Sequence, residues 1–158
     1  MTMKKIFNIM IAAVAICLTA ACQKEITNVS VISPEYVGEW HLSTVEVDGA
    51  VQNYPYDVYL TINGDCTFEL YQKSGDQIRY TKYTGTCKSE GNILKGAYSS
   101  GTPWGDEYAA DIEGSSLILL SSDGVERQEY IKESLSEKDK AEANVSTRSA
   151  ADVMSPIL

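Results

Sequence analysis

Between residues 36 and 133, short apolar stretches alternate with turn sequences at the spacing of β-hairpins. Each turn sequence holds a glycine beside Asp, Asn, Glu or Ser, which are the residue types that hairpin turns favour. The seven turns are Asp48-Gly49, Asn63-Gly64-Asp65, Ser74-Gly75-Asp76, Glu90-Gly91-Asn92, Ser100-Gly101, Glu113-Gly114-Ser115 and Asp123-Gly124. They predict eight strands, over about residues 38–47, 58–62, 66–71, 78–87, 93–98, 106–112, 116–121 and 125–131.

Within these strands apolar residues alternate with polar ones, as in Val58, Leu60 and Ile62, which typifies an antiparallel sheet with one buried face. No long helical period interrupts the series. The pattern predicts an all-β fold, an eight-stranded antiparallel up-and-down meander barrel with a short C-terminal helix. The side chains expected to face its interior, and to line any ligand cavity, are Leu60, Phe68, Leu70, Tyr83, Tyr108 and Leu117.

A charged segment over residues 134–143 follows the last predicted strand and predicts the short helix. Ser134 or Ser136 is expected to cap its N-terminus. The Ser- and Ala-rich stretch after it, from residue 144 to 158, is expected to be mobile. Residues 153–158 are nevertheless apolar enough to dock on the domain.

The first 22 residues have the pattern of an export signal. Lys4 and Lys5 precede an apolar run over 6–18, which is shorter than the roughly 20 residues that span a bilayer. Thr19-Ala20-Ala21-Cys22 follows and resembles the lipobox of bacterial lipoproteins. The resemblance implies that Cys22 becomes the first residue of the mature chain and is anchored to the membrane by acyl chains such as palmitate. An ordinary secretory signal cleaved after Ala21 is the alternative.

This predicts a protein of the bacterial cell envelope, with the outer membrane expected and its periplasmic or surface side left open. The expected organisation is a signal peptide over 1–21, a lipidated N-terminus and tether over 22–35, a barrel over 36–133, and a helix and tail over 134–158. Removing the signal leaves 137 residues, enough for one domain.

The mature part is acidic. Loss of Lys4 and Lys5 leaves 11 Lys and Arg against 22 Asp and Glu, a net charge of −11. No cluster of basic residues exists, so nucleic acid is not expected as a partner. No CxxC motif occurs and His41 is the sole histidine, so neither a metal nor another cofactor is expected.

Two cysteines, Cys66 and Cys87, remain in the predicted domain. In an oxidising envelope such a pair favours a disulfide, with two free thiols as the alternative. A hairpin that turns at Ser74-Gly75 pairs residues whose numbers sum to 149, which places Tyr83 opposite Cys66. A bridge then needs a bulge, for which Gly85 is the candidate, a shifted turn, or pairing across another strand.

Gly38-Glu39-Trp40 opens the first predicted strand, and eight short strands and a brief helix follow. This arrangement resembles the lipocalins, and more closely the lipocalin-like lipoproteins of bacterial envelopes, over about residues 36–143. The resemblance implies that Trp40 packs across the closed end of the barrel against an Arg late in the chain. Arg127 is the first candidate for that partner and Lys132 the second.

Two functions are carried forward. In the leading one, the barrel of a membrane-anchored lipoprotein binds a small hydrophobic molecule among the predicted interior residues. The alternative for each of these residues is that it only forms part of the hydrophobic core. In the second, the barrel is a scaffold that binds an envelope protein through exposed aromatics, Trp104 in the loop 98–105 and Tyr54 in the run 53–57. Trp104 could instead fold back over the mouth of the barrel.

An enzyme is not expected. His41 alternates to the face opposite Trp40, and neither a Ser nor a Cys lies in a recognisable nucleophile motif.

Overall fold

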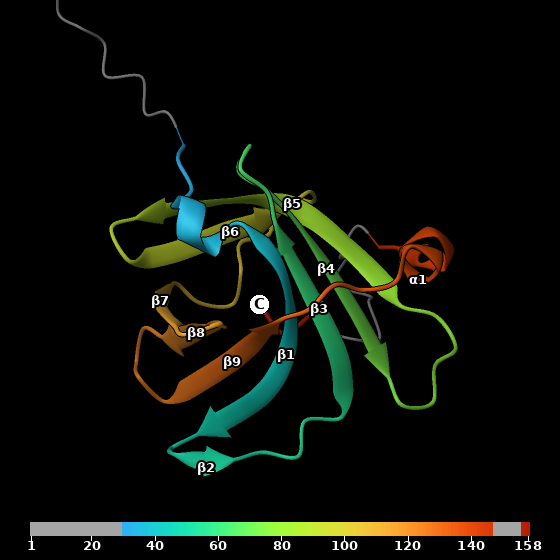
Figure 1. Ribbon diagram of the computed structural model, residues 1–158, viewed down its shortest axis with the longest axis horizontal. Coiled ribbons are helices and arrows are strands. Elements are labelled where there is room, and N and C mark those ends of the chain that lie inside the picture. The colour runs from blue at the N-terminus through green and yellow to red at the C-terminus, as the bar shows by residue number, and fades with distance from the viewer. Residues whose placement is uncertain (1–29, 147–155) are drawn as a thin grey trace, which may run out of the picture.

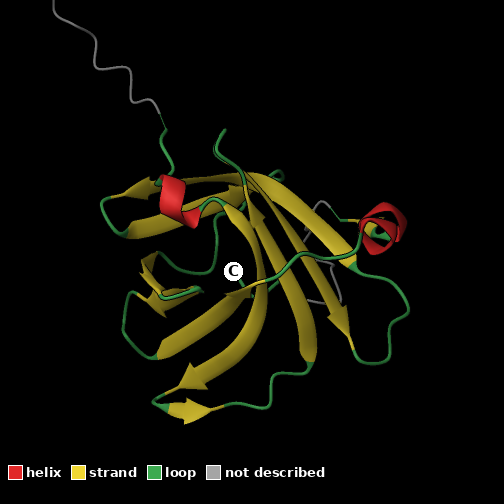
Figure 2. Cartoon of the chain, viewed as in Figure 1, coloured by secondary structure: helices red, strands yellow, loops and turns green. Residues whose placement is uncertain are grey.

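The computed structural model describes residues 30–146 and 156–158, so the predicted signal peptide and Cys22 lie outside the described residues. The described chain folds into a closed eight-stranded antiparallel barrel with a short helix near its C-terminus (Figures 1 and 2). The barrel strands are β1 (Gly38–Val47), β3 (Tyr56–Ile62), β4 (Thr67–Ser74), β5 (Thr81–Glu90), β6 (Ile93–Tyr98), β7 (Tyr108–Glu113), β8 (Ser116–Ser121) and β9 (Glu126–Lys132). The remaining elements are the 3-10 helix η1 (Pro34–Tyr36), β2 (Ala50–Val51), α1 (Glu137–Glu142) and β10 (Asn144–Val145).

Each barrel strand pairs with its neighbours in the chain, and pairing of β1 with β9 and of β5 with β6 completes the ring. The contact between β6 and β7 is the shortest, with two residue pairs, Ile93 with Ala109 and Leu94 with Tyr108. The long connection over 99–107 separates these two strands. This weakly paired wall is where the chain can fold back into the barrel.

The turn residues explain most of the strand boundaries. Gly91 and Gly114 each adopt φ 63° in a two-residue loop between paired strands, a conformation that glycine takes at little cost. Three predicted strands, over 38–47, 93–98 and 116–121, agree with the structure at both ends, and the others differ by one to three residues at an end.

The predicted register of the hairpin between β4 and β5 is wrong. Thr67 pairs with Thr86 and Phe68 with Gly85, so the numbers of two paired residues sum to 153 instead of 149. The connection is a six-residue loop over 75–80 rather than a tight turn at Ser74-Gly75, and its Ile78 is 94 % exposed instead of belonging to a strand. The register runs through Gly85 without a bulge. The irregularity of the barrel lies in β1 instead, between Leu42 and Thr44.

The segment after β9 packs on the outside of the barrel, where β10 adds in parallel to β5. Ser136 caps α1 by accepting a hydrogen bond from the main-chain N–H of Asp139, at 3.1 Å, as one of the two expected caps. Within the described residues no helix is long and apolar enough to cross a bilayer.

Candidate functional site inside the barrel

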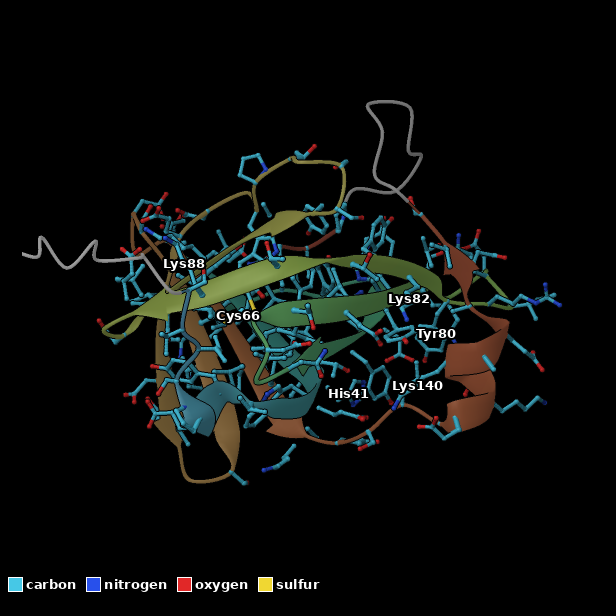
Figure 3. The ribbon with its side chains drawn as sticks, turned by 90° about the horizontal axis from the view of Figure 1, so that it is seen from above. His41, Cys66, Tyr80, Lys82, Lys88 and Lys140 are labelled. Carbon is cyan, nitrogen blue, oxygen red and sulfur yellow. The ribbon has the colours of Figure 1, made fainter. Side chains whose placement is uncertain are left out.

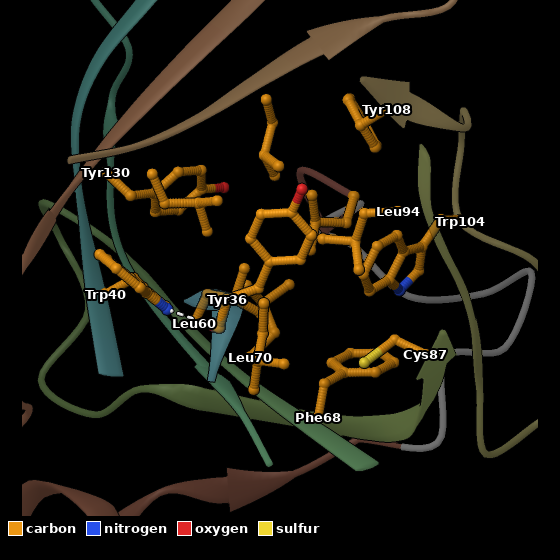
Figure 4. Close-up of a cluster of buried hydrophobic side chains, with 14 of the residues drawn as sticks. Tyr36, Trp40, Leu60, Phe68, Leu70, Cys87, Leu94, Trp104, Tyr108 and Tyr130 are labelled. Carbon is orange, nitrogen blue, oxygen red and sulfur yellow. Dashed lines mark hydrogen bonds between the residues drawn. The ribbon is translucent and has the colours of Figure 1, made fainter. Parts of the chain in front are cut away.

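One end of the barrel is covered by η1, and we call it the helix-capped end. The buried Tyr36 donates its hydroxyl to the main-chain oxygen of Ala110 at 3.0 Å. The indole N–H of Trp40 donates to the main-chain oxygen of Tyr36 at 2.9 Å, the dashed line in Figure 4. Since both aromatic polar groups are satisfied within this cap, the cap is a structural closure that needs no ligand.

The basic residue over Trp40 is Lys132, and the prediction of Arg127 is wrong. Lys132 is directly opposite Trp40 in the β1–β9 pairing, with Nζ 5.6 Å from the ring centroid. Arg127 is opposite Glu46 at the far end of β9, and it forms ion pairs at 3.3–3.7 Å with the carboxylates of Glu46, Glu113 and Glu129. Alternation along β9 puts Arg127 on the face opposite the buried Gln128 and Tyr130, and the bulge in β1 brings Glu46 onto the same outer face.

The barrel interior is packed with large side chains (Figure 4). All the residues predicted to face inward belong to its main core cluster, with exposed fractions of 3 % or less: Leu60, Phe68, Leu70, Tyr83, Tyr108 and Leu117. Their burial fits a core role and places them where a ligand inside the barrel would be in contact.

Trp104 is inside the barrel, so its predicted role as an exposed interaction anchor is wrong. The main-chain N–H of Trp104 donates to the oxygen of Gly96 at 2.9 Å, which folds the loop back along β6. The indole is 4 % exposed and packs edge-to-face on Phe68 and Tyr108, at centroid distances of 5.1 and 6.4 Å. The ring lies against Gly96, where an added Cβ would be 2.5 Å from its Cε2 atom. A glycine in the middle of a strand was the sequence signal for this close approach.

Tyr54 is half-buried. Its ring contacts that of Tyr56 edge-to-face at 5.2 Å and packs against the main core. Burial raises the pKa of its hydroxyl above the usual value. Neither aromatic predicted to bind a partner protein is therefore fully exposed.

The opposite end of the barrel is occupied by the last three residues, 156–158, and we call it the tail-capped end. The terminus lies within the ring of strands in Figures 1 and 2, and Leu158 is 1 % exposed in the main core. The main-chain N–H of Ile157 donates to Oε1 of Gln72 at 3.2 Å, and the hydroxyl of Tyr98 donates to the main-chain oxygen of Leu158 at 2.5 Å. The expectation that this apolar segment docks on the domain is confirmed for residues 156–158.

The buried side chains of the wall near the tail include two amides, and the carboxylate of the partly buried Glu126 accepts a hydrogen bond from Gln128 at 2.5 Å. Gln72 and Gln128 are fully buried, and no buried side chain among the described residues is ionic. Tyr130 donates its hydroxyl to Oε1 of Gln128 at 2.6 Å. Burial raises the pKa of Tyr108 and Tyr130 well above that of free tyrosine, so both hydroxyls stay protonated. This end of the interior therefore offers hydrogen-bonding side chains, among them Gln72 and Tyr98, beside an apolar core.

Comparison with known families decides what kind of barrel this is. The family model of the lipocalin-like domain matches residues 37–140. The chain belongs to the lipocalin-like domain family. This family is generally non-catalytic. No curated protein matches the chain.

Among solved structures, the lipocalin-like barrel is similar to the lipoprotein YedD from Klebsiella pneumoniae subsp. pneumoniae MGH 78578. The TM-score is 0.46 and the sequence identity 12 %, over 72 % of this chain and 85 % of that one.

The outer face of the lipocalin-like barrel carries a second cluster, beneath α1 (Figure 3). His41 faces outward, with Nε2 2.8 Å from Asp57 and Nδ1 3.1 Å from Glu133, and its ring stacks on Tyr59 at 4.2 Å. Tyr80 donates its hydroxyl to the same Asp57. The contact with Glu133 fastens the segment after β9 to the sheet, and the others join β1, β3 and the loop over 75–80. The described residues contain no group of three or more His, Cys, Asp or Glu arranged to hold a metal.

Cys66 and Cys87 lie next to each other near the helix-capped end. Extending the β4–β5 register by one pair places them opposite one another, and the N–H of Cys87 donates to the oxygen of Cys66 at 2.9 Å. Both are thiols in this structure, Cys66 half-buried and Cys87 buried. Burial raises the pKa of Cys87 to about 12. The observed register thus removes the geometric objection that the predicted one raised.

A separate groove of about 750 Å³ runs over the outside of β5 and β6, next to the cysteines. Charged residues of both signs line it, and Lys95 forms ion pairs there with Glu90 and Glu107, at 3.0 and 3.5 Å. The indole nitrogen of Trp104 borders this region without a hydrogen-bond partner, but it is buried beneath the surface. The groove combines charged residues of both signs with the apolar Ala97, Pro103 and Trp104.

Proposed function

We propose that this chain is a lipid-anchored protein of the bacterial envelope whose lipocalin-like barrel binds a small, mostly apolar molecule at the tail-capped end. The observation that carries the proposal is that residues 156–158 fill this end of the interior, where Gln72 and Tyr98 hold them by hydrogen bonds. A site that accommodates a separate stretch of chain has the size and the mixture of apolar and neutral polar groups that small ligands need. The six interior residues named above are proposed to line the cavity along the barrel, with the rings of Phe68 and Tyr83 next to Tyr98 at centroid distances of 5.5 and 6.1 Å.

Anchoring through Cys22 is proposed from the sequence, because the lipobox-like Thr19-Ala20-Ala21-Cys22 follows a short basic and apolar signal. Two or more acyl chains hold a protein stably on a membrane, since each buried methylene contributes about 0.8 kcal/mol. Replacing Cys22 with Ala should abolish labelling by radioactive palmitate and move the protein from the membrane to the soluble fraction. Unchanged membrane association would refute the anchor.

A scaffold that binds an envelope protein is the second candidate, and it has less support. Trp104 is buried, and Tyr54 is half-buried against Tyr56. The exposed large apolar residues, among them Val51, Ile78 and Val145, lie on separate elements of the fold.

We also propose that Cys66 and Cys87 form a disulfide in the oxidising envelope. A single main-chain hydrogen bond of 2.9 Å, from the N–H of Cys87 to the oxygen of Cys66, holds the two backbones close together just before β4 begins. A bridge would tie the start of β4 to β5 next to the helix-capped end.

Native mass spectrometry tests the ligand. Residues 23–158, which include every residue of the described fold, are purified from the envelope of the natural host and measured before and after extraction with organic solvent. A reproducible additional mass of a few hundred daltons that extraction removes would support a carrier and give the ligand class. Protein without additional mass under all gentle conditions would contradict it.

A further inference from the structure

The tail-capped end binds its own chain through main-chain atoms. We infer that this end is a binding site for short apolar peptide segments, of which residues 156–158 are the resident and displaceable occupant. The inference rests on the proposed function of a ligand-binding barrel and names the chemical class of the ligand.

Two wall side chains contact the tail in a way that suits a peptide. Gln72, on β4, offers a carbonyl oxygen to the N–H of Ile157, and Tyr98, on β6, offers a hydroxyl to the main-chain oxygen of Leu158. Because one contact requires an N–H donor and the other an oxygen acceptor on the next residue, together they match one amide N–H and the following main-chain oxygen.

An alkyl chain cannot reproduce both contacts. A fatty acid carries oxygen acceptors at one end but no N–H donor, so it would satisfy Tyr98 and forfeit the bond to Oε1 of Gln72. The loss of this one hydrogen bond should weaken binding about tenfold. A ligand with amide groups is therefore favoured over a purely aliphatic one.

The side chains of the tail define the preference further. Leu158 is buried in the main core, and Pro156 is also buried, while Ile157 is partly exposed. The wall around them holds Gln72 and Gln128 and no buried ionic side chain, so a charged side chain at the position of Leu158 would be disfavoured. The preferred peptide has an apolar residue of about the size of leucine at the position that Leu158 occupies.

Tethering explains why the tail occupies the site in the absence of a partner. A segment joined to its own binding site has an effective concentration of the order of millimolar, so a separate peptide competes poorly at micromolar concentration. Ejecting the tail by mutation should therefore reveal the site.

The experiment uses residues 23–158 and a fluorescently labelled peptide with the sequence of residues 153–158. Leu158→Asp in the protein should eject the tail, since burying an unpaired carboxylate is costly, and should increase affinity for the peptide at least tenfold over the unmodified protein. The control peptide carries the same Leu158→Asp change and should not bind. A fluorescent C16 fatty acid is titrated in parallel as the competing ligand class.

A second variant tests the role of the main-chain contact. Adding Gln72→Leu to the Leu158→Asp protein should weaken peptide binding about tenfold and leave fatty-acid binding unchanged. If the Leu158→Asp protein binds the fatty acid but not the peptide, the peptide inference is overturned and the barrel remains a carrier. If it binds neither ligand, the inference and the proposed function both fail.

Hydrogen exchange decides the question without a tail variant, should Leu158→Asp fail to fold. In the unmodified protein the Ile157 amide should be protected, and millimolar peptide should accelerate its exchange by displacing the tail, while the amide of Cys87, which is bonded to Cys66, keeps its rate. An Ile157 exchange rate that peptide does not change would contradict displacement.

Discussion

The two ends of the barrel are closed in different ways. At the helix-capped end, Trp40 bonds to Tyr36 four residues earlier, and the cap continues directly into β1, while one further bond joins Tyr36 to Ala110 across the barrel. At the tail-capped end, Leu158 contacts Tyr98 sixty residues away, and Ile157 contacts Gln72 across 85 residues. A closure built into the first strand forms with the barrel, whereas a closure made by a distant segment can open while the barrel persists.

The buried side chains at the two ends of the barrel also differ in polarity. Near the helix-capped end the core is mainly aliphatic and aromatic, with Ile32, Ile62 and Leu117 buried. Near the tail it includes Gln72 and Gln128. Buried polar groups cost stability unless they are satisfied, so their concentration at one end marks that end as the one suited to recognition.

The largest expected effect comes from the two tryptophans. Trp40→Ala and Trp104→Ala should each lower the free energy of unfolding by about 3–5 kcal/mol, because both remove a buried indole. Trp104→Ala should also accelerate amide exchange at Ile157 more than the loss of global stability alone would. Trp40→Ala should change the Ile157 exchange rate only as far as it lowers global stability. Denaturant melts and exchange mass spectrometry measure the two quantities, and equal effects of both variants on the tail would erase the proposed difference between the ends.

The second-largest expected effect is that of a disulfide between Cys66 and Cys87, which would stabilise the fold next to the helix-capped end. Protein purified under oxidising conditions should be 2 Da lighter than after reduction, and reduction should cost about 3 kcal/mol of unfolding free energy. In the reduced protein at pH 8, iodoacetamide should modify Cys66 first, because a pKa of about 12 keeps buried Cys87 in its unreactive thiol form. An unchanged mass on reduction would establish two free thiols.

Gly85 tests how tightly the wall is packed. An added Cβ would lie 2.0 Å from the main-chain oxygen of Ala97 and 2.7 Å from the Phe68 ring, so Gly85→Ala should destabilise by about 1–3 kcal/mol or more. Gly75→Ala is the matched control, because nothing lies within 4 Å of its added Cβ. Thermal melts of the two variants should therefore differ, and similar melts would show that the wall can relax around the methyl group.

The smallest effect concerns the cation over Trp40. Lys132→Met should cost about 0.5–1 kcal/mol, since the pair lies at the edge of the barrel, and Lys132→Arg should retain most of it. Arg127→Met provides the comparison at the other end of β9, where exposed ion pairs contribute about 0–1 kcal/mol. An effect confined to Arg127 would restore the partner that the sequence favoured.

Local chemistry in the sequence determined the strands and their faces. Glycine-containing turns such as Glu90-Gly91-Asn92 placed the hairpins, and alternation put Leu60, Phe68 and Tyr83 inside, because both signals act over a few residues. The resemblance carried by Gly38-Glu39-Trp40 likewise led to the family to which the chain belongs.

Tertiary structure decided the features that depend on distant segments. The length of the loop over 75–80 set the β4–β5 register, the bulge in β1 brought Glu46 opposite Arg127, and the β1–β9 pairing placed Lys132 opposite Trp40. Gly96 leaves room for the inward turn of Trp104, but neither that turn nor the docking of residues 156–158 is fixed by nearby residues alone. Those contacts form only once the barrel has closed around them, so their energy resides in packing between segments and not in the propensity of either one.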